Sequence, residues 1–125
     1  MKSKKQLLRQ EADKLWYRKY LKDKCEVCGS TFILQAHHFY YRSSYAHCRF
    51  LKDNHITLCR RCHFLLHHQD PKKIEEQIIQ KRGQKWLKTL QKMAYKRPKP
   101  SFETIGYYQN RIEAINLIKT FIYSY

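Results

Sequence analysis

The sequence predicts a small α+β fold, with α-helices on either side of a central segment rich in cysteine and histidine. Apolar residues recur at spacings of three and four before and after this segment, as they do along amphipathic helices. Residues 31–41, inside it, are rich in β-branched and aromatic side chains, which favour extended structure. A length of 125 residues is typical of one compact unit, so we expect a single domain overall.

The first predicted helix covers residues 4–22 of a basic N-terminal segment, 1–24, with a net charge of +6. In the central core, 25–70, residues 55–58 form a second strand candidate and residues 60–68 a short helix. All seven His and all five Cys of the chain lie in this core. The residues that can bind metals or transfer protons are therefore concentrated in the middle of the chain.

Two further helices are expected after the core. Asp70-Pro71 is a helix start, because Asp is a good N-cap and Pro suits the first helical position. We predict a basic amphipathic helix over 71–97, with a bend at Gly83. Apolar residues at helical spacing also predict a C-terminal helix within 101–125 that packs on the others.

The formal net charge of +16 favours a polyanionic partner, either a nucleic acid or an anionic membrane. Residues 1–24 and 72–99 together carry +14 of this charge, which is more than ordinary solvated helix faces need. We expect the basic helices within 1–24 and 72–99 to contact phosphate groups without reading sequence. We also single out eight basic residues of the core and of the helix that follows it. These are Arg42, Arg60, Arg61, Lys81, Arg82, Lys85, Lys88 and Lys92.

No apolar run approaches the ~20 residues that span a bilayer. The N-terminus also lacks the apolar stretch of about 7–15 residues that a signal peptide contains. We therefore expect a protein that is not secreted and that works in the reducing cytoplasm. In that compartment, clustered Cys and His bind a metal more often than they form disulfides.

Four cysteines predict a structural zinc site. Cys25 and Cys28 form one pair with two residues between the thiols, and Cys59 and Cys62 form a second pair with the same spacing. Each turn presents two sulfurs to one point, so two such turns complete a tetrahedral site. The alternatives are a disulfide or simple core cysteines. Cys48 fits neither pair and is expected to be an ordinary loop or core thiol.

Histidines of the same segment predict a second metal site. His63 and His67 are four positions apart, so on a helix they lie ~40° apart and face one point. Together with an imidazole from a strand they form a three-nitrogen cation site that leaves positions open for water and phosphate. A further His beside the cation can act as general base near neutral pH. Taken singly, each His is more typical of an ordinary surface or core residue.

In order, these residues resemble an HNH endonuclease. The pattern is Cys25-x2-Cys28-Gly29, then Ala36-His37-His38-Phe39, then Asn54-His-Ile-Thr-Leu58-Cys59-x2-Cys62-His63-x3-His67. The resemblance covers about a third of the chain. It implies a zinc-stapled ββα-metal core, treble-clef-like, in which a β-hairpin and a helix hold one divalent cation over the scissile phosphate.

The resemblance also implies roles for single residues. His37 would join His63 and His67 on the catalytic cation, which could be Mg²⁺, Mn²⁺, Ni²⁺ or Zn²⁺. His38 would be the general base, and Asn54 would tie the loop to the backbone near that base. The family commonly has Asp or Glu near the base, whereas Ala36 precedes the pair here. The metal preference should therefore shift toward ions that favour imidazole.

The sequence thus predicts a metal-dependent endonuclease that hydrolyses DNA phosphodiester bonds, nicking as a monomer and cutting both strands as a possible homodimer. Its setting would be a bacterial cell or a phage-infected host, for a phage or mobile-element nuclease or for a restriction or repair enzyme. One alternative is a non-catalytic zinc module that binds DNA or RNA, with an incidental histidine cluster. Another is a basic protein at an anionic membrane surface, which leaves the Cys and His residues without a role.

Overall fold

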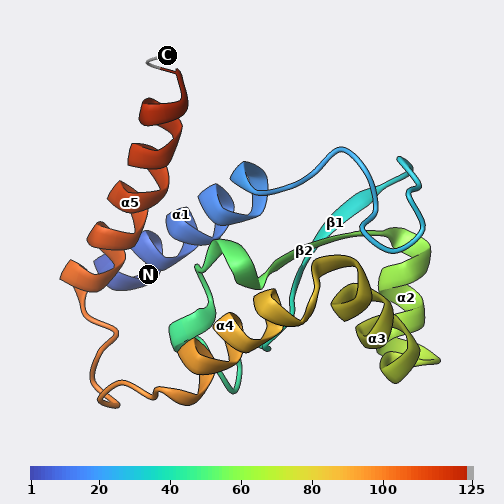
Figure 1. The fold of residues 1–125 in the computed structure, drawn as a ribbon. Helices are drawn as coiled ribbons and strands as arrows, with labels where there is room; N and C mark the ends of the chain where they lie inside the picture. Colours follow the sequence, from blue (N-terminus) through green and yellow to red (C-terminus); the bar gives the residue numbers. More distant parts are fainter. Residues whose placement is uncertain (124–125) are drawn as a thin grey trace. The chain divides into compact units, whose positions relative to one another are not determined.

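The computed structural model describes the backbone of residues 1–123 and the side chains of residues 1–117. Over this range the chain forms five α-helices, two short 3-10 helices and one antiparallel pair of strands (Figure 1). The predicted α+β class is confirmed. In chain order the elements are α1 (Lys4–Lys19), β1 (Leu34–His38), η1 (Ala46–Cys48), η2 (Lys52–Asn54), β2 (His55–Cys59), α2 (Arg60–His68), α3 (Pro71–Arg82), α4 (Gln84–Tyr95) and α5 (Ile105–Tyr123).

The chain divides into two compact units, and the first contains the packed helices α1 and α5. Ser3 caps α1 through a capping box with Gln6, which satisfies backbone N–H groups at the start of the helix. Trp16 is buried on α1 and Tyr108 is buried on α5. The expected C-terminal helix is thus present and packs on α1, while residues 124–125 of that prediction lie outside the described residues.

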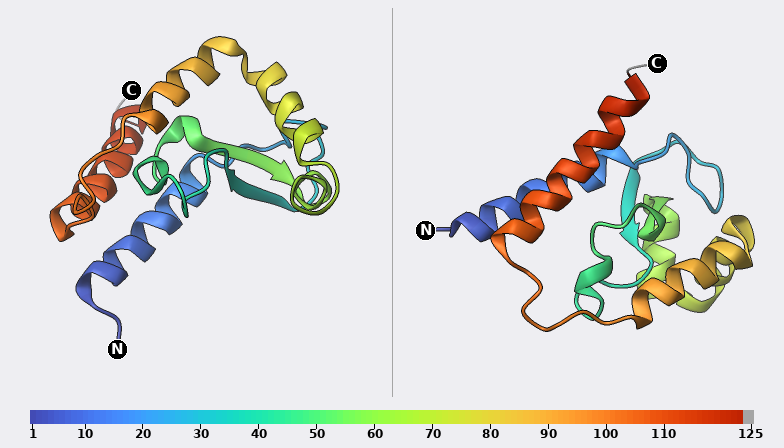
Figure 2. Two further views of the ribbon diagram at one scale, coloured as in Figure 1. Left: turned by 90° about the horizontal axis from the view of Figure 1, so that it is seen from below. Right: turned by 60° about the vertical axis from the view of Figure 1, so that its left-hand side comes forward.

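The second unit, residues 21–97, is built around the hairpin of β1 and β2. In its register His37 lies opposite Ile56, and His38 lies opposite His55. Every residue of β2 is buried, and α2 begins directly after the strand (Figure 2). The core of this unit joins the hairpin to α2 and α3, and its buried members include Ile56, Leu58, Leu66, Ile74 and Ile78.

Three elements differ from the sequence prediction. The extended segment predicted at 31–41 is a strand only over Leu34–His38, and Ile33 before it has a positive φ of 48°. The first helix ends at Lys19, because the backbone N–H of Lys22 donates to the Thr57 hydroxyl instead. The single helix predicted over 71–97 is two helices, because Gly83, with φ of 96°, ends α3 and begins α4. A residue with a side chain adopts this conformation only with strain.

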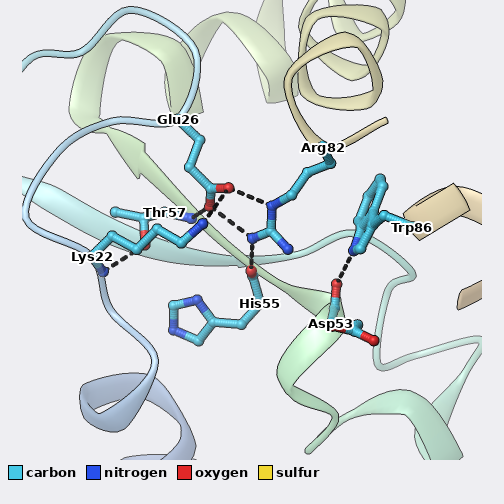
Figure 3. Close-up of polar contacts among 7 residues, drawn as sticks. All are labelled: Lys22, Glu26, Asp53, His55, Thr57, Arg82 and Trp86. Atoms are coloured by element: carbon cyan, nitrogen blue, oxygen red, sulfur yellow. Dashed lines mark hydrogen bonds and ion pairs between the residues drawn. The ribbon is translucent and has the colours of Figure 1, made fainter. Parts of the chain in front are cut away.

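A buried ion pair fastens the loop before β1 to the end of α3 (Figure 3). Arg82 donates to both carboxylate oxygens of Glu26, at 2.5 and 3.0 Å, and also to the carbonyl of His55 at 2.6 Å. The backbone N–H of Thr57 donates to Glu26 as well, at 2.6 Å. Burial alone would raise the pKa of Glu26, but Arg82 and the Thr57 N–H outweigh it and lower that pKa.

This pair corrects one sequence prediction. Arg82 is predicted to contact DNA phosphate, yet its side chain is only 16% exposed and its guanidinium is bonded inside the protein. The same guanidinium lies 5.3 Å from the ring centre of Trp86, whose indole N–H donates to the carbonyl of Asp53. Arg82 therefore holds α3 and the start of α4 against the hairpin.

Candidate functional site

Two clusters of metal-ligating side chains lie in the second unit, and the first is made of four cysteines. The sulfur atoms of Cys25, Cys28, Cys59 and Cys62 all lie within 4.8 Å of one another. Three of these residues are buried and Cys28 is exposed. The predicted gathering of the two thiol pairs is confirmed, and this group could hold a structural metal such as zinc.

Local backbone geometry brings the four sulfurs together. In the first pair the N–H of Gly29 donates to the carbonyl of Cys25 at 2.9 Å, and Gly29 has a φ of 76° that suits glycine. In the second pair Cys59 is the N-cap of α2, and its sulfur accepts the N–H of Cys62 at 3.4 Å. A tight glycine turn and a helix start thus each aim two thiols at the same point.

The four thiols do not ionise equally readily. Burial opposes ionisation of Cys25, but backbone N–H donors at Cys28 and Cys59 outweigh it and lower the Cys25 pKa to about 7. Burial raises the pKa of Cys28 and of Cys62, and neighbouring thiols raise that of Cys62 further. The Cys25 thiolate thus forms readily, whereas ionisation of Cys28 and Cys62 is opposed. A divalent cation would compensate the repulsion between the thiolates.

The remaining cysteine has no part in this group. Cys48 is fully buried on η1, and burial raises its pKa to about 11. It is therefore a core thiol, one of the two ordinary roles expected for it.

The second cluster consists of His37, His63 and His67, whose ring nitrogens also lie within 4.8 Å of one another. The Nε2 atoms of His63 and His67 are 2.9 Å apart, about the separation of two ligands each bound at ~2.0–2.1 Å to one ion. His37 on β1 is buried, whereas His67 on α2 is exposed, so the cluster is open on one side. The adjacent His68 is not part of the cluster, because its ring packs against that of Phe64.

A glutamine that the sequence pattern did not single out sets the tautomer of one of these histidines. The side-chain oxygen of Gln35 lies 2.7 Å from Nδ1 of His63. Because an amide oxygen only accepts, Nδ1 carries the proton, and the lone pair of the ring is on Nε2, which faces His67. Gln35 lies two residues before His37 and so on the same face of the strand, which is the sequence signal that could have identified it as a neighbour of the cluster.

Burial keeps two of the ligand candidates, His37 and His63, neutral. Desolvation, with smaller contributions from His63 and His67, lowers the pKa of His37 to about 3. Burial and the neighbouring His67 likewise lower the pKa of His63. A metal binds neutral imidazole, so these environments prepare the nitrogens as ligands at neutral pH.

The next residue after His37 has a different environment. His38, the expected general base, has Nε2 at 3.0 Å from the carbonyl oxygen of Arg49. A carbonyl only accepts, so Nε2 carries the proton and the basic lone pair of the neutral ring is on Nδ1. The adjacent histidines thus differ in surroundings, as expected for neighbours on a strand.

Asn54 ties together the loop that follows β1. Its side-chain oxygen accepts the N–H of Tyr40 at 2.7 Å, and its amide donates to the carbonyls of Tyr40 and Cys48 at 3.0 Å. Its own carbonyl accepts the N–H of Phe39 at 3.1 Å. A fully buried Asn54 therefore fixes the backbone just after His38. The resemblance to HNH endonucleases implies such a role for Asn54.

Most of the basic residues predicted to contact DNA are exposed, with Arg82 as the exception described above. They come from the loop after β1, from the first turn of α2, and from α3 and α4. The exposed ones are Arg42, Arg60, Arg61, Lys81, Lys85, Lys88 and Lys92.

Comparison with known proteins gives no relative for this chain. No family model matches it, and neither does any curated protein or solved structure. None of the helices in the described part of the chain has the length and apolar character to cross a bilayer. Function therefore has to be inferred from the side chains of the two clusters.

Proposed function

We propose that this protein is a metal-dependent endonuclease of the HNH type that hydrolyses phosphodiester bonds in DNA. The observation that carries the proposal is the gathering of three imidazoles, from His37, His63 and His67, beside a fourth histidine with a defined tautomer. A module that only binds DNA has no need for an open three-nitrogen cluster next to a general base. The four cysteines support a zinc-stapled core, because their closed thiolate set suits a structural Zn²⁺ ion.

The residues present fit a catalytic cation. His37, His63 and His67 would hold it through neutral nitrogens, and Gln35 would keep Nε2 of His63 available. When bound, the cation would supply Lewis-acid stabilisation of negative charge on the phosphate and on the departing oxygen. Because all three ligands are imidazoles, we favour Ni²⁺ or Zn²⁺ over Mn²⁺ or Mg²⁺ at this site.

The base of the proposed reaction is His38. The hydrogen bond from its Nε2 to the carbonyl of Arg49 orients the ring, and with the proton on Nε2 the nitrogen that would take a proton from the attacking water is Nδ1. The same bond stabilises the imidazolium formed in that step, because a carbonyl oxygen is a good partner for a charged donor. Asn54 acts as a positioning residue, since it fixes the backbone that directly follows His38.

The proposed substrate is supported by charge. The chain carries a net charge of +16, and seven of the eight basic residues singled out from the sequence are exposed. Lys and Arg on the surface contact phosphate groups without reading sequence. One histidine cluster per chain would cut one strand, so a monomer would nick DNA and a homodimer could cut both strands.

Incubation of supercoiled plasmid with the purified protein tests the proposal. We expect nicked circles with an added divalent cation, more with Ni²⁺ or Zn²⁺ than with Mn²⁺ or Mg²⁺, and intact plasmid without an added ion. The matched variant is His38→Ala, which should bind the plasmid and leave it uncut. If the wild-type protein binds DNA tightly and never cuts it with any of these ions, the non-catalytic zinc module is the better description.

A further inference from the structure

We propose that an aromatic pocket beside the histidine cluster binds one unpaired nucleobase of the DNA strand. The inference rests on the proposed function, because it places the phosphate of that strand at the histidines. The pocket has a volume of about 390 Å³, within the ~300–1,000 Å³ typical of small-molecule sites. The loop after β1, α3 and α4 line it, and its aromatic lining is Phe39, Tyr40, Tyr41 and Tyr45.

The walls of this pocket are held in place before any ligand arrives. The backbone of Tyr40 is bonded on both sides to Asn54, at 2.7 and 3.0 Å. The rings of Tyr40 and Tyr45 pack edge to face at 4.8 Å. Arg97 lies 4.6 Å from the ring centre of Tyr45 and donates to the carbonyl of Ser44 at 2.7 Å. A preformed pocket loses little conformational entropy on binding, which favours affinity.

Tyr41 connects the pocket with the histidine cluster. Its ring lines the pocket and also lies 5.8 Å from the ring of His37 and 6.2 Å from that of His67, measured between centroids. The side chain is 44% exposed, so part of it is accessible to a ligand. A strand whose phosphate lies at the histidines can therefore place a neighbouring base against Tyr41.

The chemistry of the lining selects a base over a phosphate. Every base has a π-face that stacks on aromatic side chains. Glu75 at the pocket carries a negative charge, which repels phosphate but can accept hydrogen bonds from the amino group of adenine, cytosine or guanine. Gln91 adds an amide that both donates and accepts. Arg42, which is exposed and follows Tyr41 in the chain, is the basic residue that would contact the flanking phosphate.

Stacked bases of an intact duplex cannot enter such a pocket without being unstacked, which costs energy. The expected substrate class is therefore DNA with an accessible base, as in a single strand, a bulge or a mismatch. The pocket would give the nuclease a preference for DNA that contains an unpaired base, whereas the basic helices would bind paired and unpaired DNA alike.

The test is a binding titration that does not depend on cleavage. Fluorescence anisotropy is measured for zinc-loaded protein without added divalent cation, and a denaturing gel confirms that the probes stay intact. Two duplexes of one sequence are compared, one fully paired and one with a single bulged adenine. We expect the bulged duplex to bind more tightly. Tyr41→Leu should lower the affinity for the bulged duplex by roughly 5- to 150-fold. Tyr41→Phe should keep that affinity, because only Phe retains an aromatic face.

Phe32→Ala is the matched control, since Phe32 is an aromatic residue of the same unit that is 70% exposed and lies outside the pocket. It should leave both affinities unchanged. Equal binding of the two duplexes by the wild-type protein would overturn the inference, and so would an equal loss for both duplexes in Tyr41→Leu. Failure of the proposed function looks different, because plasmid would stay uncut while the bulged duplex is still preferred.

Discussion

The two metal-ligating clusters share a hairpin and a helix but differ in exposure. The cysteine cluster offers four ligands, three of them buried, whereas the histidine cluster offers three ligands and is open to solvent at His67. Cys62 and His63 are consecutive on α2, yet they belong to different clusters. A closed four-ligand set is typical of a structural metal, and an open three-ligand set is typical of a reactive one. One short helix thus supplies residues to both clusters.

The largest expected effect separates the clusters by stability. Cys59→Ser should abolish the fold of the second unit, because structural zinc is worth roughly 10–16 kcal/mol and small domains have only ~5–15 kcal/mol in total. Cys48→Ser should cost far less, since Cys48 lies outside the cluster. Thermal unfolding followed by circular dichroism, with zinc measured by elemental analysis, checks both variants. A folded, zinc-free Cys59→Ser protein would remove the structural role of this cluster.

The next effect separates chemistry from metal binding within the histidine region. His38→Ala should lower the cleavage rate by about 10²–10⁴-fold, the usual contribution of a general base, and leave cation binding intact. His67→Ala should instead weaken cation binding, and excess metal should partly restore cleavage. Cleavage rates titrated against metal concentration distinguish the two. The assignment of the base would be reversed if His37→Ala behaved as the pure rate variant.

A smaller effect is expected from the glutamine behind the histidines. Gln35→Ala removes the acceptor at Nδ1 of His63, so the ring loses its preferred tautomer. Loss of such a partner typically costs 10–100-fold in metal affinity. Isothermal titration with Ni²⁺ into zinc-loaded protein measures this, and Gln80→Ala, on the exposed face of α3, is the control. Unchanged affinity in Gln35→Ala would show that the tautomer does not limit binding.

The pH dependence of metal binding should also differ between the clusters. With the Cys25 pKa lowered to about 7 and those of Cys28 and Cys62 raised, the thiols must release protons to bind a metal near pH 7. Cysteine-site affinity should therefore rise steeply with pH. His37 and His63 have lowered pKa values and are already neutral, so these two ligands should add no pH dependence near pH 7, and the histidine-site affinity should change with pH less steeply than the cysteine-site affinity. Calorimetry in buffers of different ionisation enthalpy counts the released protons.

The smallest effect concerns DNA binding and should leave metal binding at both clusters unchanged. Replacing the exposed Lys85, Lys88 and Lys92 by Gln should reduce the slope of log affinity against log salt by about 0.9 for each phosphate that these lysines neutralise. The zinc content and the thermal midpoint should stay as in the wild type. An unchanged slope would show that these lysines of α4 do not face the DNA.

Local signals explain which parts of this fold were predictable. The helix expected at 60–68 is α2, because its apolar periodicity and its N-cap at Cys59 lie within one short stretch. The two thiol pairs are likewise visible from their spacing. The sequence predicts only a bend at Gly83, whereas its positive φ ends one helix and begins another, because glycine can adopt either sign of φ and the sequence does not show which it takes.

Contacts between distant residues explain what was missed. Arg82 is basic and lies on a basic helix, but its partner Glu26 is 56 positions away, so its structural role is not visible locally. Gln35 depends on the same kind of contact, because only the packing of β1 against α2 brings its side chain to His63. The aromatic pocket requires three elements that meet only in the folded chain.

The most direct test of two metals with two roles is a partial chelation experiment. Zinc-loaded protein is treated with a chelator that removes only the weaker ion, and its fold, zinc content and plasmid cleavage are then measured. We expect folded protein with one tightly held zinc, no cleavage, and cleavage restored by added Mn²⁺ or Ni²⁺. Undiminished cleavage by this protein, or loss of the fold in step with loss of cleavage, would contradict the division between the cysteine and histidine clusters.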